Sequence, residues 1–212
     1  MKNIPMFTTD AGVASLILEE IPYKRCAYIR LQDANDPEKL LLDAVCFCKT
    51  VGAETIYATG NDYLLSYPLH TEIWEMTLQR PEPFMAETTL IPVDETNIGD
   101  WQNLYNTYMA NIPNAATMTS TGAQKLLQAK DGFFMSCSGV IIGIGKAKED
   151  RVDVIVSLVP GKGDDVLHAL FCALSGDRIK VEVASANRKA VKLYERNGFV
   201  KTSVLSKWYQ VL

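Results

Sequence analysis

Apolar residues recur along the chain with a period of two in some segments and a helical period in others, which predicts an alternation of strands and helices. Alternating apolar positions between turn residues predict strands over residues 24–31, 54–60, 67–78, 88–94, 132–139, 140–148, 151–159 and 179–184. Helical spacing predicts helices over residues 10–20, 36–52, 97–112, 121–130, 163–174 and 187–196. This order indicates an α/β (α+β) protein whose mixed, mostly antiparallel central sheet is flanked by helices.

The most specific local pattern is the strand and helix near the end of the sequence. The strand over residues 179–184 is followed by small residues, and Ser185 or Asn187 can cap the helix that comes next. Asn197-Gly198 supplies the left-handed residue that commonly ends a helix. Any good cap and any apolar stripe would satisfy the structure alone, so the particular residues need a further explanation.

A weak internal echo connects two parts of the chain. Residues 29–61 and residues 156–187 each read as a strand, a turn, a helix, a strand and a small-residue turn that ends in Asn. Strand-helix-strand units are common, so a chance match and a pair of duplicated half-sheets both remain open.

The segment of residues 80–87 contains two prolines and reads as a linker. We therefore expect two domains, residues 1–85 and residues 86–212. The first is interpreted as a degenerate half-domain that extends the sheet of the second.

Composition narrows the class of protein. The chain has 212 residues, 48% hydrophobic residues and a net charge of −4, which is enough apolar content for a real core. The sequence shows neither an apolar run of about 18 residues nor a signal-peptide core, so we expect a cytoplasmic protein with no membrane partner. The five cysteines form no CxxC pair and are expected to be reduced apolar side chains rather than metal ligands. No metal site is predicted.

Charge is distributed unevenly along the chain. Residues 178–207 hold eight Lys or Arg and two acids, so this region would attract an anion. Nucleic acid is not an expected partner, because the chain is acidic overall and has no basic stripe interleaved with stacking aromatics.

A glycine-rich turn marks the first candidate for ligand chemistry. Gly161 and Gly163 bracket Lys162 where one strand ends and a helix begins. Glycines let the backbone approach a ligand closely, and the N–H groups at a helix start suit phosphate oxygens. Two glycines and a proline also describe an ordinary tight loop, so the loop alone decides nothing.

The loop and the terminal helix together resemble the GNAT superfamily of acetyl-CoA-dependent N-acetyltransferases. The residues that carry the resemblance are Asn187, Ala190, Tyr194, Glu195, Gly198 and Phe199. Element order extends it over roughly residues 87–212, with the specific motifs between Val152 and Phe199. The resemblance implies an acyl-CoA N-acyltransferase-like fold, acetyl-CoA as cosubstrate, and an amine-bearing acceptor.

The resemblance also implies which residues hold the cofactor. They are Leu158, Val159, Gly161, Lys162, Gly163, Asn187, Arg188, Lys189 and Tyr194. The family's phosphate loop opens with Gln or Arg, and here Leu158 stands at that position. Asp164 and Asp165 follow the glycines, and two acids beside a phosphate would weaken binding unless nearby cations offset them. The matching loop of residues 31–37 has no glycine, so residues 1–85 are not expected to bind coenzyme A.

The mechanism implied by the resemblance is direct attack of the amine on the acetyl carbonyl. A backbone N–H near Leu158 or Val159 holds the oxyanion, and Tyr194 returns a proton to the departing thiolate. Asp153 and Glu182 are the candidate bases, although either can equally be an exposed strand carboxylate. His70 and His168 are interpreted as structural. Trp101, Tyr105 and Tyr108 are either core residues or the lining of an acceptor site.

Two classes of function remain at this point. One is an active N-acetyltransferase that acts on a primary amine of a small molecule or a peptide. The other is a GNAT-like fold that has lost catalysis and serves as a binding or assembly module. The altered phosphate loop favours the second and the Asn187 to Phe199 motif favours the first, which we prefer. A homodimer also remains open.

Overall fold

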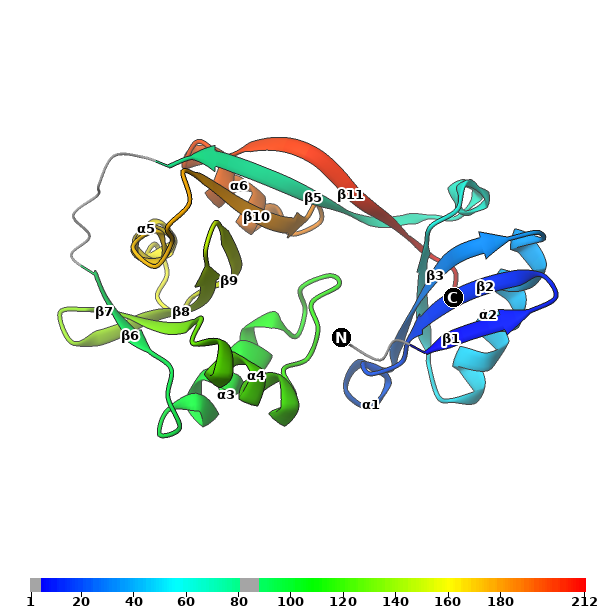
Figure 1. Ribbon diagram of the computed structural model, residues 1–212, viewed down its shortest axis with the longest axis horizontal. Coiled ribbons are helices and arrows are strands. Elements are labelled where there is room, and N and C mark those ends of the chain that lie inside the picture. Colours follow the sequence, from blue (N-terminus) through cyan, green and yellow to red (C-terminus); the bar gives the residue numbers. More distant parts are fainter. Residues whose placement is uncertain (1–4, 81–87) are drawn as a thin grey trace. The chain divides into compact units, whose positions relative to one another are not determined.

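The computed structural model describes residues 5–80 and 88–212, and the chain divides into two compact units (Figure 1). Unit 1 comprises Met1–Ile73 with Val204–Leu212, and unit 2 comprises Trp74–Ser203. Apart from Arg80, the expected linker lies outside the described residues, and so does the expected boundary between residues 85 and 86. No helix in the described part of the chain is long and apolar enough to cross a membrane.

Unit 1 is a sheet with one long helix on its apolar face. Its strands lie in the order β1-β2-β3-β4-β11-β5, with β3 parallel to β4 and the other recorded pairs antiparallel. Leu40, Leu41 and Ala44 of the helix α2 pack into the core. The elements are β1 (Met6–Thr9), β2 (Gly12–Ile17), α1 (Ile21–Lys24), β3 (Cys26–Ala34), α2 (Pro37–Thr50), β4 (Thr55–Thr59), η1 (Asp62–Ser66), β5 (Leu69–Gln79) and β11 (Val200–Gln210).

The helix predicted over residues 10–20 is wrong, because this segment forms part of the antiparallel β1–β2 hairpin and pairs with β3. Ala14, Ser15 and Leu16 are all buried, so β2 shows a short continuous buried run instead of clear alternation. Such a run fits a strand and a helix equally well by periodicity, and hydrogen bonding to β3 decides between them.

Unit 2 is a sheet covered by helices on both faces. Its strands lie in the order β6-β7-β8-β9-β10-β5-β11, and β7, β8 and β9 form the predicted antiparallel meander. The helices α5 and α6 pack on one face, and α3 and α4 pack on the other. The elements are β6 (Thr88–Pro92), α3 (Ile98–Met109), α4 (Ser120–Ala129), β7 (Gly132–Cys137), β8 (Val140–Lys148), β9 (Arg151–Ser157), α5 (Gly163–Phe171), β10 (Arg178–Ala184) and α6 (Arg188–Arg196).

Two glycines of β8 set how closely α5 approaches the sheet. A side chain at Gly143 would begin 2.6 Å from Val166 Cγ2, and one at Gly145 would begin 2.7 Å from Leu170 Cδ1. Because no side chain intervenes at either position, α5 lies directly on the strand. This contact fixes where the glycine-rich turn before α5 stands.

The two units share one strand order, apart from β6, which is an additional edge strand of unit 2. In each, a hairpin is followed by a third antiparallel strand and a fourth parallel strand. After the parallel strand, the order in unit 1 continues with β11 and then β5, and in unit 2 with β5 and then β11. The internal echo in the sequence therefore has a counterpart in the order of the strands.

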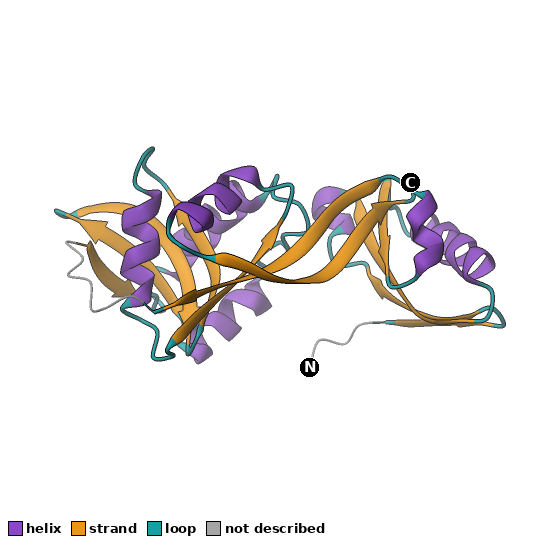
Figure 2. Cartoon of the chain, turned by 90° about the horizontal axis from the view of Figure 1, so that it is seen from above, coloured by secondary structure: helices purple, strands orange, loops and turns teal. Residues whose placement is uncertain are grey.

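Two strands, β5 and β11, belong to the sheets of both units. They are neighbours in the sheet and, at 11 residues each, the longest of the described strands (Figure 2). Each of them has residues in both units. The remaining predicted helices and strands are confirmed with ends displaced by a few residues, and so is the mixed, mostly antiparallel sheet.

Candidate functional site

The strands β9 and β10 of unit 2 run parallel but remain paired over a short stretch. Among the described residues the pairs are Arg151 with Lys180 and Val152 with Val181. Both strands continue toward Ser157 and Ala184 beyond the recorded pairs. The matching strands β3 and β4 of unit 1 pair over five residues. The carboxyl ends of β9 and β10 therefore part, whereas those of β3 and β4 stay closed.

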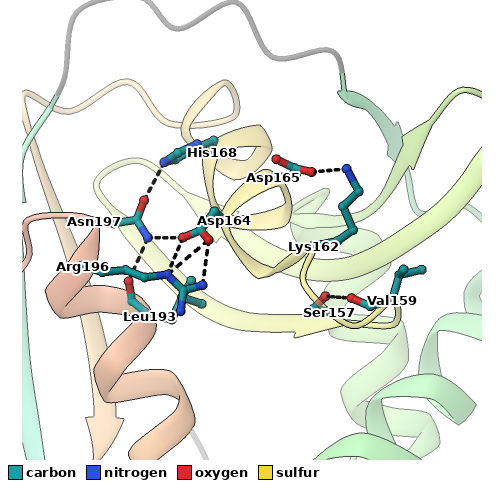
Figure 3. Close-up of polar contacts among 9 residues, drawn as sticks. All are labelled: Ser157, Val159, Lys162, Asp164, Asp165, His168, Leu193, Arg196 and Asn197. Carbon is teal, nitrogen blue, oxygen red and sulfur yellow. Dashed lines mark hydrogen bonds and ion pairs between the residues drawn. The ribbon is translucent and has the colours of Figure 1, made fainter.

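The backbone turns sharply where β9 ends. The Leu158 N–H donates to the Ile142 carbonyl at 2.8 Å, and the Ser157 hydroxyl donates to the Val159 carbonyl at 2.8 Å (Figure 3). Gly161 has φ +83°, the left-handed region in which a side chain is strained. Of the two N–H groups proposed for an oxyanion, that of Leu158 is engaged, and that of Val159 has no acceptor in the described part of the chain.

The helix α5 begins at this turn without a side-chain cap. Its N-cap residue is Lys162, whose side chain accepts nothing from the first turn. The matching helix of unit 1 is capped instead, because Asp36 Oδ1 accepts from the Lys39 N–H at 3.0 Å. Uncapped first-turn N–H groups carry partial positive charge and need an acceptor from outside the helix. Of these two matching helices, only α5 leaves its start open to an anion.

The two acids at the start of α5 are both paired. Arg196 holds Asp164 through Nε to Oδ1 at 2.8 Å and Nη2 to Oδ2 at 2.7 Å (Figure 3). The hydrogen bond from Arg196 keeps the pKa of Asp164 below its ordinary value. Asp165 lies 2.7 Å from Lys162 Nζ. Nearby cations therefore offset the repulsion that these acids would exert on a phosphate.

Asn197 connects the end of α6 to α5. Its Nδ2 donates to Asp164 Oδ1 at 2.6 Å and to the Leu193 carbonyl at 2.8 Å (Figure 3). Its Oδ1 is therefore an acceptor, and it lies 2.6 Å from Nε2 of His168. This arrangement requires a proton on Nε2 of the imidazole. His168 thus braces Asn197, in keeping with its structural interpretation.

The helix α6 is capped as its sequence predicts. Asn187 Oδ1 accepts from the Ala190 N–H at 3.2 Å, and Gly198 follows the helix with φ +86°. Arg188 and Lys189 are exposed in the first turn. The apolar stripe of α6 packs into the core of unit 2.

Tyr194 belongs to that stripe. Its side chain is 4% exposed, and its ring centroid lies 5.4 Å from that of Phe199. Burial raises the pKa of Tyr194, because a phenolate is poorly solvated there. The hydroxyl is therefore protonated at neutral pH and can act only as a proton donor.

Of the two candidate bases, Asp153 is the third residue of β9, and Glu182 directly follows the last recorded pair of β10. Asp153 Oδ2 is 2.7 Å from Lys146 Nζ, and Glu182 Oε1 is 2.6 Å from Arg151 Nη2. Ser157 is the fourth residue after Asp153, which is about 13 Å along the strand. The Glu182 carboxylate is bound to Arg151, the first residue of β9, so its ion pair also lies away from the glycine-rich turn where the cofactor candidates gather.

The aromatic residues considered for an acceptor site separate into two groups. Trp101 and Tyr105 are buried and stacked at 5.5 Å, with Trp101 Nε1 donating to the Phe133 carbonyl. Tyr108 is exposed. Trp101 and Tyr105 thus have core contacts.

His70, in unit 1, stacks on Tyr57 with ring centroids 4.0 Å apart, and burial lowers the pKa of His70.

No protein-family model matches the sequence, and no curated protein matches it either. Solved structures do match. A functionally unknown conserved protein from Staphylococcus epidermidis superposes with a TM-score of 0.61 at 12% identity, over 98% of this chain and 93% of its own. A proposed acetyltransferase from Pyrococcus horikoshii gives 0.58 at 10% identity, over 95% and 69%. A GNAT-family acetyltransferase from Colwellia psychrerythraea gives 0.52 at 12% identity, over 97% and 83%. The chain has the GNAT fold.

Within this GNAT fold, sequence reasoning missed the polar network between α5 and α6. From the sequence, Asp164 reads only as a charge beside a phosphate, and Asn197 only as a helix stop. Arg196 and Asn197 are 32 and 33 residues from Asp164. No local spacing reports such a contact, and the only available signal was that Arg196-Asn197 precedes the glycine that ends α6.

Proposed function

We propose that the protein is an N-acetyltransferase that transfers the acetyl group of acetyl-CoA to a primary amine of a small molecule or peptide. One observation carries this proposal: β9 and β10 part beside the uncapped start of α5, in a chain with the GNAT fold. The opened backbone and the uncapped first-turn N–H groups suit an extended anionic ligand.

The residues at this position fit the phosphates of the cosubstrate. A Cβ at Gly161 would meet nothing within 4 Å, and one at Gly163 would meet its nearest atom at 3.5 Å. The backbone is therefore accessible at both glycines, with Lys162 between them. Leu158 and Val159 stand at the end of β9, and Asn187, Arg188, Lys189 and Tyr194 stand on the α6 side. We assign this set to cofactor binding.

The chain's own groups supply two steps of the reaction. The Val159 N–H is available to hold the carbonyl oxygen as it gains charge, and the Tyr194 hydroxyl donates a proton to the departing thiolate. Acetyl-CoA supplies the thioester. Removal of the amine proton is assigned to water, to Asp153 or to Glu182. Each of the two carboxylates would have to act from within an ion pair.

The second candidate function is a GNAT-like module that binds without catalysing. The substitution of Leu158 for Gln or Arg in the phosphate loop favours it, and so does the ion pairing of both candidate bases. The two functions differ in whether the protein converts a substrate. Both require a folded, GNAT-like unit 2.

We expect acetyl-CoA to raise the melting temperature in a concentration-dependent way. A ligand that binds only the native state stabilises it by RT ln(1 + [L]/Kd), which is about 2.7 kcal/mol at one hundred times Kd. A thermal-shift titration up to millimolar acetyl-CoA measures this. The absence of any response would exclude the acetyltransferase proposal.

Gly163→Asp is expected to abolish that shift. The new carboxylate would enter at the start of α5, where its Cβ meets only ordinary contacts, so folding should persist while phosphates are repelled. Asn35→Asp adds the same charge to the exposed matching loop of unit 1 and serves as the control. A normal shift in the Gly163 variant would place the ligand elsewhere.

Substitutions of Asn187 separate its capping role from cofactor binding. Asn187→Ala removes the acceptor for the Ala190 N–H and should destabilise the protein by about 1 kcal/mol. Asn187→Asp keeps that acceptor, so its stability should remain near wild type while its acetyl-CoA affinity falls for lack of the amide donor. Denaturant unfolding and calorimetric titration provide the two readouts. Equal affinity in the Asp variant and the wild type would leave Asn187 with a capping role alone.

A further inference from the structure

We propose that the Arg196 guanidinium is the phosphate-binding cation of the site, and that Asp164 and Asn197 are the residues that position it. This inference rests on the proposed use of acetyl-CoA. It assigns a ligand contact to a residue that the sequence gives only as part of a helix end.

The first support is the place of the guanidinium. Arg196 Nη2 lies 3.7 Å from the position that a Cβ would take at Gly163, the residue with which α5 begins. The charge therefore stands next to the turn where phosphates are expected, although Arg196 comes from the last turn of α6. The side chain is about half exposed, so a ligand can reach it.

The second support is the number of donors that stay available. A guanidinium has five N–H groups. Asp164 accepts from one edge, through Nε and one N–H of Nη2. Nη1 and the remaining N–H of Nη2 make no recorded bond within residues 5–80 and 88–212. Three donors therefore remain for phosphate oxygens.

The third support is that the position of the arginine is fixed in advance. Asp164 binds it in a bidentate manner, and Asn197 Nδ2 holds the same carboxylate from a second direction. His168 in turn holds Asn197 Oδ1 (Figure 3). A side chain ordered before binding loses less conformational entropy when the ligand arrives. A surface ion pair adds only about 0–1 kcal/mol to stability, so the effect of this network that matters for the proposal is the order it gives to Arg196.

The arrangement also accounts for the choice of arginine. A lysine could supply the charge at this position, but it could not engage Asp164 with one planar edge and a phosphate with another. The acid that follows Gly163 consequently orients the cation instead of opposing the ligand.

Calorimetric titrations of acetyl-CoA and of ADP test the proposal, because both ligands carry a pyrophosphate. Arg196→Gln should weaken both by about 10- to 100-fold, the usual effect of a lost hydrogen bond to a charged group. Lys192→Gln removes the same charge from an exposed position one turn earlier on α6 and should change either affinity less than twofold. Arg196→Lys should fall between wild type and the Gln variant.

Each outcome decides the matter. Wild-type affinity for acetyl-CoA and ADP in Arg196→Gln would overturn this inference and leave the proposed function standing. Weakening that is confined to acetyl-CoA would overturn it too, because the phosphate contact would then not be responsible. A wild-type protein that binds no acetyl-CoA would overturn both proposals. The melting temperature of each unliganded variant shows that it is folded, and Arg196→Lys gives a second test if the Gln variant is not.

Discussion

Tyr194→Phe is expected to lower turnover about 10- to 1000-fold while acetyl-CoA affinity stays nearly unchanged, because the change removes only a hydroxyl that serves as general acid. The ring lies in the core beside Phe199, and phenylalanine keeps that packing. Steady-state kinetics with an accepted amine, together with calorimetric titration of acetyl-CoA, would separate the two effects.

The matched control is Tyr209→Phe, which removes a hydroxyl from a similarly buried tyrosine of unit 1. This variant should turn over at the wild-type rate. Undiminished acetylation by the Tyr194 variant would leave that residue with a packing role alone.

The pH dependence of this step has a definite direction. Burial raises the pKa of Tyr194 from its ordinary value of 10.0, so the proton-donating form persists to a higher pH than for an exposed tyrosine. Any loss of rate between pH 7 and pH 10 should therefore come from other groups. The shape of the pH–rate profile in that window should be the same for wild type and for Tyr194→Phe, at very different absolute rates.

Deletion of residues 204–212 is expected to unfold unit 1. In that unit β11 lies between β4 and β5, with Tyr209 opposite Ala58 and the Gln210 N–H bonded to the Pro68 carbonyl. The deletion removes an interior strand and leaves the core around Tyr209 open. Amide hydrogen exchange in β4 should rise to the unfolded rate. By the same reasoning, residues 1–85 expressed alone should not fold cooperatively.

Two point variants of β11 test its contribution to the stability of unit 1 with smaller changes. Tyr209→Ala removes a buried aromatic ring and should cost about 3–5 kcal/mol. Leu205→Ala, at an exposed position of the same strand, should cost less than about 1 kcal/mol. Protection of β4 that survives the deletion would show that unit 1 is complete without β11.

Much of the secondary structure could be predicted because local signals agree with the final contacts. The helix α2 has Asp36 as its cap and a clear apolar stripe, and α6 begins at Asn187 and ends before Gly198. Residues 10–20 failed because a buried strand without alternation has no distinctive period. The sequence could not predict that β5 and β11 belong to the sheets of both units, because an alternating pattern identifies a strand but not its neighbours.

The candidate site divides in the same way. The turn at Gly161 could be predicted from its glycines, and it has the positive φ that a glycine provides. The ion pair of Asp164 with Arg196 could not, because it depends on the angle at which α5 crosses α6.

The place of β11 in unit 1 has a consequence for biosynthesis. Residues 200–210 leave the ribosome after every other strand of that sheet, yet they belong in its interior between β4 and β5. Unit 1 cannot close its sheet during translation, and β4 waits with an unpaired edge while more than 140 residues are added. Unpaired edges are sites of aggregation. Nascent chains stalled before residue 200 should therefore depend on a chaperone that shields β4, and released chains should not.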